Sequence, residues 1–365
     1  MSNPTNERSR LPTMQDIAAK AGVAPMTVSR VINGAARVSP QMRKRVERAI
    51  EELDYHPNAL ARSLKSRRSR LIGILLPEIV NPFSAVLANS IEETLLQRGY
   101  SAFISTTGTS VQREQAALQT FFDHRVEGII VATMDTPAGT EALQKFIRLG
   151  LACVVVGRES ANCDADRVTI DHRGGAREAV EHLISLGHRR IGFIGASPES
   201  ARRLGRFRGF EDALQTHNLA IDDSLIVGPG VESGPGYSTE DDGYTGMHRL
   251  LSFSNRPTAV FARNDFTAMG AIRAARDRGV QIPDGIAIAG FDNVPLAAYF
   301  TPPLTTVAQP TTEEGHAAAS LLLERIEADA QRTYREVRFD CRLVVRQTTV
   351  KSPDEKCADP RGMPR

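Results

Sequence analysis

The alternation of short apolar runs with longer amphipathic segments is the feature that most constrains the fold of this chain. It begins at Leu71, and such alternation is typical of βαβ units with parallel strands. We expect buried strands at residues 71–76, 102–104, 128–132 and 152–156, and, after Asp171, at residues 190–194, 259–262 and 286–291. The sequence therefore predicts two successive α/β lobes, each built on a parallel sheet.

The length of the chain also favours more than one domain. Its 365 residues exceed the roughly 100 to 200 that one core usually supports. No apolar run approaches the roughly 18 residues that a membrane span needs, and the N-terminus is polar. We expect a cytoplasmic protein with no signal peptide and no membrane partner.

The cysteines define neither a disulfide framework nor a metal site. They are few and scattered along the chain, at Cys153, Cys163, Cys341 and Cys357. This usage fits a reducing compartment. We predict no metal site and no cofactor.

Basic charge is concentrated at the N-terminal end. Residues 1–70 contain 14 Lys and Arg against 6 Asp and Glu, a net charge of +8, so the remainder carries −6 of the total of +2. Clustered Lys and Arg release the counterions condensed on phosphates, so this asymmetry is typical of a segment that binds a polyanion. A solvated basic tail is the alternative interpretation.

Three short helices are predicted in this basic segment. Thr13 can cap a helix that ends at Gly22, and Pro25 occupies the first position of a second helix that runs through Asn33. A third helix begins at residues 39–40. Two helices joined by a tight glycine turn form a helix-turn-helix, whose second helix enters the major groove of DNA. A generic helical pair is the alternative.

Residues 58–70 have the composition of a linker with conditional helicity. The stretch is too short for a stable isolated helix and ends in basic residues. It contains one conspicuous apolar side chain, Leu64, for which the residues alone favour a packing role.

Long stretches of this chain resemble the lactose/galactose repressor family. The headpiece and hinge of that family are matched by TMQDIAAKAGVAPMTVSRVINGAARVS and YHPNALARSL. The resemblance continues through IGILLPEIVNPF, LGHRRIGFIG, RFRGF, PTAVFARNDFTAMGA, PDGIAIAGFDN and PPLTTVAQP, and covers roughly residues 13–349. It implies a small all-α helix-turn-helix headpiece and an α/β two-lobed core with parallel sheets, similar to periplasmic sugar-binding proteins.

The resemblance also implies which residues meet DNA. Pro25, Met26 and Arg30 match base-reading positions, and an arginine there can bond guanine bidentately, for about 1 to 3 kcal/mol of discrimination. Leu64 matches a leucine that wedges between base pairs in the minor groove. Neighbouring positions contribute phosphate contacts or helix packing, namely Thr27, Ser29 and Asn33. The whole predicted DNA-binding set is Thr13, Pro25, Met26, Thr27, Ser29, Arg30, Asn33, Asn58, Leu64 and Lys65.

A ligand cleft is predicted between the lobes. In open α/β sheets ligands bind beyond the carboxyl ends of the strands, and polar residues follow several of the expected strands. The resemblance matches an apolar wall position to Phe83 and polar ligand contacts to Arg206, Asn264 and Asp292, and Arg158 follows the fourth strand. Asp, Asn and Arg side chains together suit the hydroxyl groups of a polyol. A turn-capping role for Asp292 and a core role for Phe83 remain alternatives.

Several arginines near the predicted cleft leave the charge of the ligand open. Arg158 follows Gly157 where some relatives carry Asp, and further arginines stand at Arg202, Arg203 and Arg263. Because bidentate pairing of arginine with a carboxylate is strong, they favour an anionic ligand such as a sugar acid. Solvation of these arginines at the surface is an equal alternative.

Catalytic motifs are absent from the sequence. It contains no GxxxxGK[ST], no strand-linked GxGxxG, no HExxH and no GxSxG. A free sugar-binding transport protein would explain the two lobes but not the basic helix-turn-helix. A sugar-converting enzyme would need a general base or metal cluster that no spacing indicates. We therefore predict that the chain is not an enzyme.

The predicted domains follow from these observations. They are a headpiece over residues 1–57, a hinge and linker over 58–70, a core for ligand binding and dimerisation over 71–349, and a flexible tail over 350–365. Within the core, lobe 1 is expected at about 71–170 and 310–336, and lobe 2 at about 171–309 and 337–349.

The predicted function is sequence-specific regulation of transcription. We expect a repressor of carbohydrate or sugar-acid catabolism that binds a pseudo-palindromic double-stranded DNA operator as a homodimer. A sugar or sugar acid between the lobes would change their angle and bias the order of the hinge. A dimer is favoured over a tetramer because the tail holds prolines and no apolar heptad repeat.

Overall fold

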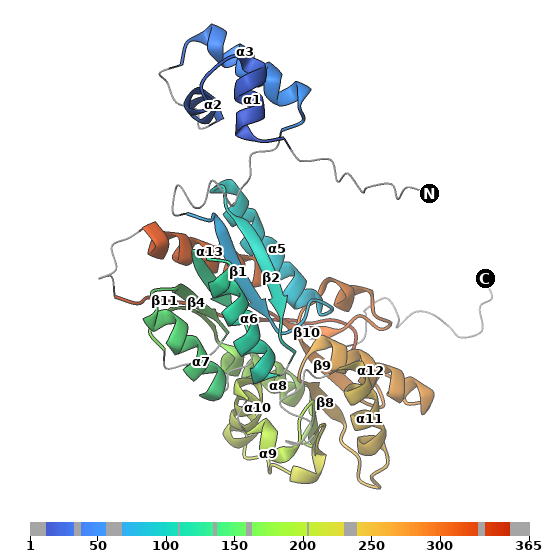
Figure 1. Cartoon of the computed structure of the whole chain (residues 1–365). Helices are drawn as coiled ribbons and strands as arrows, with labels where there is room; N and C mark the ends of the chain where they lie inside the picture. Colours follow the sequence, from blue (N-terminus) through green and yellow to red (C-terminus); the bar gives the residue numbers. More distant parts are fainter. Residues whose placement is uncertain are drawn as a thin grey trace, which may run out of the picture. The chain divides into compact units, whose positions relative to one another are not determined.

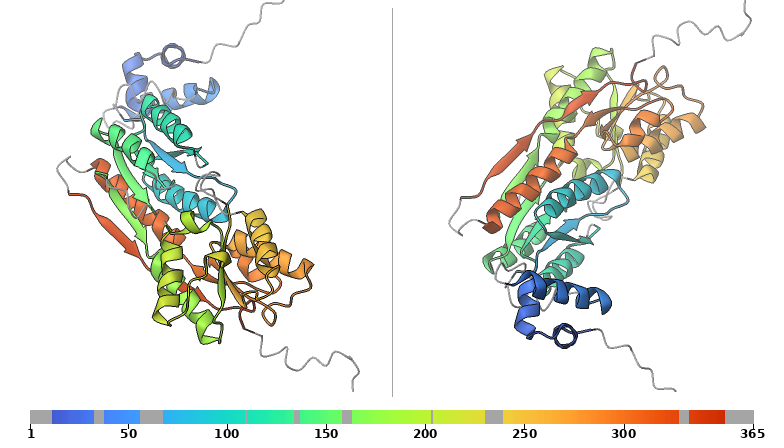
Figure 2. Two further views of the ribbon diagram at one scale, coloured as in Figure 1. Left: turned by 90° about the horizontal axis from the view of Figure 1, so that it is seen from below. Right: turned by 90° about the horizontal axis from the view of Figure 1, so that it is seen from above.

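The computed structural model describes residues 12–32, 38–55, 68–108, 110–133, 137–157, 163–202, 204–229, 239–327 and 333–350 (Figure 1; Figure 2). The chain divides into two compact units, Met1–Ser69 and Arg70–Arg365. We refer to the first as the headpiece and to the second as the core.

The headpiece contains the three predicted helices, α1 (Met14–Ala21), α2 (Pro25–Ile32) and α3 (Pro40–Glu52). Thr13 caps α1 reciprocally, because its Oγ1 accepts from the Asp16 amide at 3.3 Å while Asp16 accepts from the Thr13 amide at 2.8 Å. Gly22 ends α1 at φ 60°, a left-handed conformation that favours glycine. Ser39 caps α3 as expected.

A small apolar core holds these three helices together. Its largest fully buried members are Ile17, Val28 and Val46, one from each helix. They recur at helical spacing with other buried residues, so each helix presents one apolar face inward. The opposite faces carry the basic charge that the sequence concentrates here.

Lobe 1 is a three-layer sandwich around a six-stranded parallel sheet (Figure 1). The strands, in the order β11-β5-β4-β3-β1-β2, are β11 (Glu336–Phe339), β5 (Asp166–Ile170), β4 (Ala152–Val156), β3 (Gly128–Val131), β1 (Leu71–Leu76) and β2 (Ser101–Thr106). Their pairings are all parallel. One face is covered by α5 (Pro82–Gln97) and α13 (Thr311–Glu327), and the other by α6 (Val111–Asp123) and α7 (Pro137–Arg148).

Lobe 2 repeats this architecture with one antiparallel edge. Its strands, in the order β12-β10-β9-β8-β6-β7, are β12 (Arg342–Val344), β10 (Thr305–Ala308), β9 (Ala287–Asp292), β8 (Ala259–Ala262), β6 (Ile191–Ile194) and β7 (Ile226–Val227). Only β12 runs antiparallel, against β10. The covering helices are α8 (His172–Ser185) and α10 (Gly205–Thr216) on one face, and α11 (Glu240–Leu251) and α12 (Asp265–Asp277) on the other.

Shorter elements complete lobe 2. They are α9 (Pro198–Ala201) and the 3-10 helices η1 (Asp223–Leu225) and η3 (Pro295–Tyr299). On α10, a Cβ atom at Gly209 would lie 2.1 Å from the Arg173 carbonyl oxygen of α8. Close helix packing therefore explains the Gly205-xxx-Gly209 spacing.

All seven predicted strands are present in the described part of the chain, and five further strands there escaped prediction. The expectation of burial was wrong for β2, whose residues at the sheet edge are exposed or half-buried. The missed strands are β5, β7, β10, β11 and β12. Most of them lie at a sheet edge or beside one, where polar residues are tolerated and the apolar run is interrupted. Short, mixed runs such as Asp166–Ile170 do not stand out from loops in the sequence.

Three chain segments pass between the lobes. They follow β5, β10 and β11, at residues 170–172, 308–311 and 339–342. The expected boundary after residue 336 was wrong, because Glu336–Phe339 pairs with β5 and belongs to lobe 1. Exposed and half-buried residues alternate along β11, which is an edge-strand pattern that the sequence analysis did not detect.

Within the described ranges, no helix is both long and apolar enough to cross a membrane. No group of three or more His, Cys, Asp or Glu side chains there could hold a metal ion. Cys153 and Cys163 are buried, Cys341 is half-buried, and Cys357 lies outside the described residues.

Candidate functional site

The second helix of the headpiece directs one face outward. Val28 and Val31 are buried in the small core, whereas Pro25, Met26 and Arg30 are exposed. The Met26 side chain is 59% exposed, which is unusual for a large apolar residue. An exposed face with a long cation and an apolar tip can reach base edges and a thymine methyl group in a major groove.

The other predicted DNA-binding residues are placed differently. Thr27 and Ser29 are half-buried on α2, and the Thr13 hydroxyl donates to Asp16 at 2.6 Å within the α1 cap. Asn33, Asn58, Leu64 and Lys65 lie outside the described residues.

The cleft of the core contains a cavity of about 190 Å³ between the two lobes. Lobe 1 lines it with residues of α5 and the start of α13, and lobe 2 with the turn that follows β9. Its lining residues include Phe83, Asp292, Asn293, Gln309 and Thr311. Of the predicted ligand contacts, Phe83 and Asp292 line it directly.

A buried ion pair forms the polar centre of this cleft. Arg206, on the first turn of α10, places Nη2 3.0 Å from Asp292 Oδ1, and the side chains are only 18% and 5% exposed. The Arg206 Nη1 donates to the Arg263 carbonyl at 2.7 Å, and its guanidinium lies 4.0 Å from the Phe291 ring centre. Burial raises the pKa of Asp292, and the positive charge of Arg206 partly offsets this.

Gln309 and His172 extend the network across the chain crossings. Gln309 Nε2 donates to Asp292 Oδ1 at 2.6 Å, and Gln309 Oε1 lies 3.0 Å from His172 Nε2. The His172 ring also meets Phe291 edge-on, with centroids 5.8 Å apart. Asp292 is thus held directly by Gln309 of the second crossing, and His172 of the first crossing is joined to it through Gln309.

The turn after β9 directs Asp292 into the cavity through an uncommon backbone conformation. Asp292 and Asn293 have φ values of 110° and 53°, a region that non-glycine residues enter only when their surroundings hold them there. Asp265 supplies one such restraint, because its Oδ2 accepts from the Val294 amide at 2.8 Å. Its Oδ1 accepts from Thr306 Oγ1 at 2.5 Å, and that oxygen accepts from the Asn293 amide at 3.3 Å.

Further contacts complete this clamp on the turn. Arg346 Nη2 donates to Asn293 Oδ1 at 2.8 Å, while its Nη1 donates to the Leu304 carbonyl at 2.7 Å. Gly290 leaves space for the Asp265 carboxylate, since a Cβ atom there would lie 2.5 Å from Asp265 Oδ1. Burial and the nearby Asp292 charge raise the pKa of Asp265 to about 8. The turn is therefore held by α12, β10 and the segment after β12 together.

Two of the remaining predicted ligand contacts are not brought to the cavity by the described structure. Asn264 is buried and caps α12, where its Oδ1 accepts from the Thr267 amide and hydroxyl at 2.8 Å each. Arg158 lies outside the described residues. Asn264 thus has a structural role at the carboxyl end of β8.

The three further arginines that the sequence places near the cleft differ in their surroundings. Arg202 pairs with Asp223 at 2.8 Å on the surface of lobe 2, and Arg263 Nη1 lies 3.4 Å from the Gly195 carbonyl. Arg203 lies outside the described residues. No arginine is among the residues that line the cavity in the described part of the chain, and Arg206 reaches it only through its contact with Asp292.

Sequence reasoning missed Gln309, His172, Asp265, Thr306 and Arg346. Asp265 follows a predicted strand and stands beside Asn264, so its position at the strand end is the signal that could have found it. Gln309 is the penultimate residue of the PPLTTVAQP motif, which carries the family resemblance but no polar pattern that indicates a ligand contact. The others are recognisable only once the crossings and the segment after β12 are placed beside the turn.

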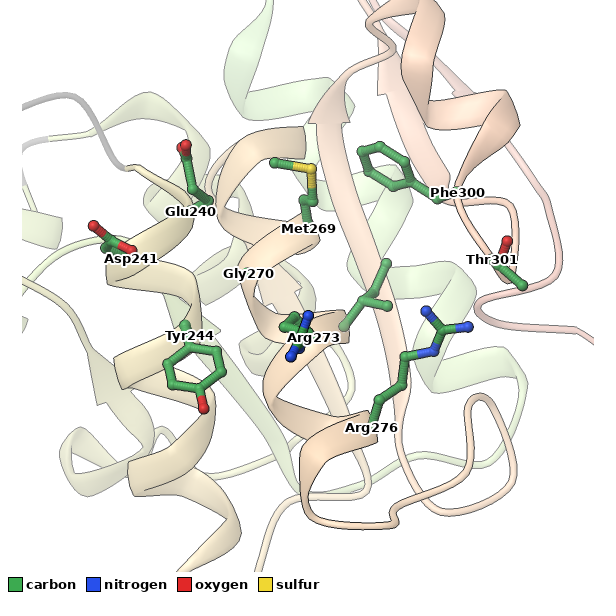
Figure 3. Close-up of a pocket in the computed structure, with 10 residues that line it drawn as sticks. Glu240, Asp241, Tyr244, Met269, Gly270, Arg273, Arg276, Phe300 and Thr301 are labelled. Atoms are coloured by element: carbon green, nitrogen blue, oxygen red, sulfur yellow. The ribbon is translucent and has the colours of Figure 1, made fainter.

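A larger hollow lies on the outer surface of lobe 2, away from this network. It measures about 400 Å³ and lies between α11, α12 and the segment after η3 (Figure 3). Tyr244, Met269, Arg273 and Phe300 line it. Two large apolar side chains of η3 are exposed nearby in sequence, Leu296 at 52% and Tyr299 at 83%. Such an exposed apolar patch is typical of a protein interface.

Two family descriptions match this chain. Residues 13–58 match "Bacterial regulatory proteins, lacI family", and residues 180–349 match "Periplasmic binding protein-like domain". The first match covers the described helices of the headpiece and the second covers most of lobe 2 with α13, β11 and β12.

Whole-length relatives extend these matches. The ribose operon repressor of Haemophilus influenzae is 35% identical over 92% of this chain and 98% of its own length. The transcriptional repressor PurR of Mannheimia succiniciproducens is 33% identical over 93% and 99%. Among solved structures, the lac repressor dimer bound to operator and an anti-inducer is similar with a TM-score of 0.81, at 27% identity over 93% of this chain and 99% of that one.

Proposed function

This chain belongs to the lacI family of bacterial regulatory proteins, and on that premise we propose that it represses transcription under the control of a small ligand bound at the Arg206–Asp292 pair. The chain is a DNA-binding regulator with a headpiece for operator DNA and a two-lobed core for an effector. The observation that carries the ligand proposal is Asp292, which lines the cavity and is paired with the half-buried Arg206 behind it.

The exposed face of α2 is the proposed base-reading surface. Arg30 reads guanine through its two parallel donors and Met26 contacts a thymine methyl group. Asn33, Asn58 and Lys65 are proposed to support phosphate contacts, and Leu64 to wedge into the minor groove. The proposed hinge spans residues 58–70. It follows the DNA-binding residues 1–57 and precedes the ligand-binding residues 71–349.

The proposed ligand is a neutral, small polyhydroxylated molecule. The charge of Arg206 is already matched by Asp292, and Gln309 adds both a donor and an acceptor nearby. The cavity of about 190 Å³ is below the roughly 300 Å³ at which pockets for drug-sized ligands begin. Phe83 offers an apolar wall against a sugar ring. A sugar acid is the second candidate, because Arg158 and Arg203 could supply cationic donors.

The geometry of the cleft does not favour catalysis. Asp292 is tied to Arg206 and Gln309, so it is not poised to take a proton from a substrate. The relatives are transcriptional repressors, and we propose that this chain likewise has no enzymatic activity. Because its partner is operator DNA, we place its action in the cytoplasm.

The hollow of lobe 2 is the proposed contact with a second copy of the chain. The related lac repressor binds its operator as a dimer, and two copies are needed to read two half-sites. Met269 and Phe300 offer an apolar centre, with Glu240 and Arg273 at its edge (Figure 3). The exposed η3 residues Leu296 and Tyr299 precede Phe300 in the chain. Met269→Glu is expected to yield monomers in sedimentation velocity while the core stays folded by circular dichroism. A dimer of unchanged affinity would remove this face from the interface.

The ligand proposal is tested by thermal shift of the full chain. Wild type is screened against D-ribose and other neutral sugars, the matching aldonic acids, and purine bases, and hits are titrated in the presence of selected operator DNA at fixed salt. We expect stabilisation by a neutral sugar, retained in Arg202→Ala and lost in Asp292→Asn. Stabilisation by aldonic acids alone would favour the second candidate, and equal stabilisation of Asp292→Asn would place the ligand elsewhere.

A further inference from the structure

One buried acid in the core lacks a partner. Glu314 is the fourth residue of α13, which begins just after the second lobe crossing, and it is fully buried. Neither of its carboxylate oxygens accepts or donates a hydrogen bond within the part of the chain that the structure describes. Its neighbour Glu313 is exposed on the same helix. Buried polar groups are rarely left unpaired, so this position calls for a physical reason.

A carboxylate in such surroundings is stable only with its proton. Removing a charge from water without pairing it is so costly that the group shifts its pKa and becomes neutral instead. Burial raises the pKa of Glu314 to about 8, and the negative charge of Asp292 acts in the same direction. Arg206 opposes this effect without overcoming it, since its guanidinium is engaged by Asp292 and the Arg263 carbonyl.

The surroundings of Glu314 are the crossings between the lobes. Three charged side chains shift the pKa of Glu314. Asp292 on β9 and Glu313 on α13 raise it, and Arg206 on α10 lowers it. Cys341, in the third crossing, is close enough for Glu314 and Asp171 to act on its pKa, which burial raises to about 12. His172, in the first crossing, acts in turn on Asp292. On the side of α5, the neighbouring His316 lies 2.9 Å from Thr94 Oγ1.

We propose that Glu314 is a proton-linked hinge residue, whose loss of a proton makes the three lobe crossings open more readily. A closed junction buries Glu314 without a partner and therefore keeps it protonated. An open junction admits water, which solvates the charged carboxylate. Alkaline conditions thus favour opening, and the acidity of the medium sets how easily the lobes move. This extends the proposed function, because lobe movement is how a ligand in the cleft would act on the hinge.

The sign and size of the effect follow from linkage. If the carboxylate has an ordinary pKa in the open junction and one of about 8 in the closed junction, opening rises with pH between these values. The opening constant then grows by up to about tenfold per pH unit, and it levels off above about pH 8. A group with the same pKa in both states would give no dependence.

Hydrogen exchange of the ligand-free full chain tests this inference. Amide protection is measured by mass spectrometry at several pH values from 6 to 9, in peptides spanning the crossings 170–172, 308–311 and 339–342. Glu314→Gln keeps the shape but holds no charge, and at each pH it experiences the same intrinsic exchange chemistry as wild type. Glu313→Gln is the matched control, one residue away and exposed.

We compare the amide protection of each protein with that of Glu314→Gln at the same pH. In wild type and in Glu313→Gln, this relative protection should fall by several-fold to tenfold for each pH unit, and the fall should level off near pH 8. Equal protection of wild type and Glu314→Gln at every pH overturns the inference. The inference is also overturned if Glu313→Gln abolishes the pH dependence of protection as fully as Glu314→Gln does. If Glu314→Gln does not fold by circular dichroism, Glu314→Leu replaces it. No ligand is used, so failure here is distinct from failure of the proposed function.

Discussion

The headpiece and the core present their functional side chains in opposite ways. On α2, Met26 and Arg30 lie in solvent, and their partners arrive only with DNA. In the core, Asp292 is buried and Arg206 is half-buried, and they are already paired with each other, with Gln309 and with a backbone carbonyl. Side chains that bind a charged macromolecule can stay hydrated until it binds. Charged side chains in a buried site must be paired with protein groups before the ligand binds. Substitutions should therefore cost binding in the headpiece but folding as well in the core.

The largest effect should follow from removing one partner of the buried pair. Arg206→Ala leaves Asp292 buried and unpaired, which is expected to lower the free energy of unfolding by about 3 to 5 kcal/mol. Urea unfolding of the full chain measures this loss. Arg202→Ala, which breaks the exposed pair with Asp223, is the control and should leave the free energy of unfolding close to that of wild type. Equal losses in both variants would mean that burial does not distinguish the two arginines.

An intermediate effect is expected for the base-reading arginine. Arg30→Ala should weaken discrimination at one base pair of each half-site by about 1 to 3 kcal/mol, because two parallel hydrogen bonds to guanine are lost. Anisotropy titrations of matched and mismatched operators at constant salt give this difference. The variant should unfold like wild type, since the side chain is exposed. A stability loss as large as that of Arg206→Ala would erase the contrast between the regions.

The two regions should also respond oppositely to pH. The folded core retains a proton on Asp265, with a pKa of about 8, that the unfolded chain releases near its ordinary value of 3.8, so core stability falls as pH rises through this window. In the headpiece, hydrogen bonds from Lys20 and Arg48 lower the pKa of Glu52, so that contribution is lost as pH falls instead.

Site-resolved hydrogen exchange from pH 5 to 8 separates these trends. Asp265 can change the free energy of unfolding of the core by at most about 1.4 kcal/mol per pH unit. Asp265→Asn should remove that change and leave the headpiece unchanged. An unaltered pH dependence in this variant would show that Asp265 is already ionised at neutral pH.

The smallest effect is expected at the apolar tip of α2. Met26→Ala removes a contact with a thymine methyl group and should weaken operator binding by about 1 kcal/mol or less. The loss should be smaller than that of Arg30→Ala and should vanish when the contacted thymine is replaced by uracil. A loss that persists with uracil would assign Met26 to shape or packing rather than to base contact.

The headpiece was largely predictable because its structure is local. The Thr13 cap, the Gly22 turn, the Pro25 start and the Ser39 cap each depend on residues within a few positions along the chain. Six of the seven expected strands were predictable for a related reason, since buried parallel strands are continuous apolar runs, whereas β2 is exposed or half-buried at the sheet edge. The missed strands are short and partly polar, and their identity depends on a neighbour such as β5 beside β11.

The candidate ligand site was predictable only in part. The positions of Phe83 and Asp292 followed from strand ends and from family resemblance, and both line the cavity. Asn264 was chosen on the same grounds, yet its side chain caps α12. A strand end brings a residue to the correct edge of the sheet, but whether its side chain faces the cavity or its own helix depends on the backbone that follows.

The sequence by itself determined the local elements, the division into a basic headpiece and a two-lobed core, and the family. Tertiary structure decided which polar groups converge. Gln309, Thr306 and Arg346 reach the Asp292 turn from other segments of the chain, and Glu314 is buried without a hydrogen-bond partner among the described residues although Glu313 beside it is exposed. Secondary structure follows from short-range preferences, whereas burial and charge pairing depend on contacts that exist only after the lobes have packed.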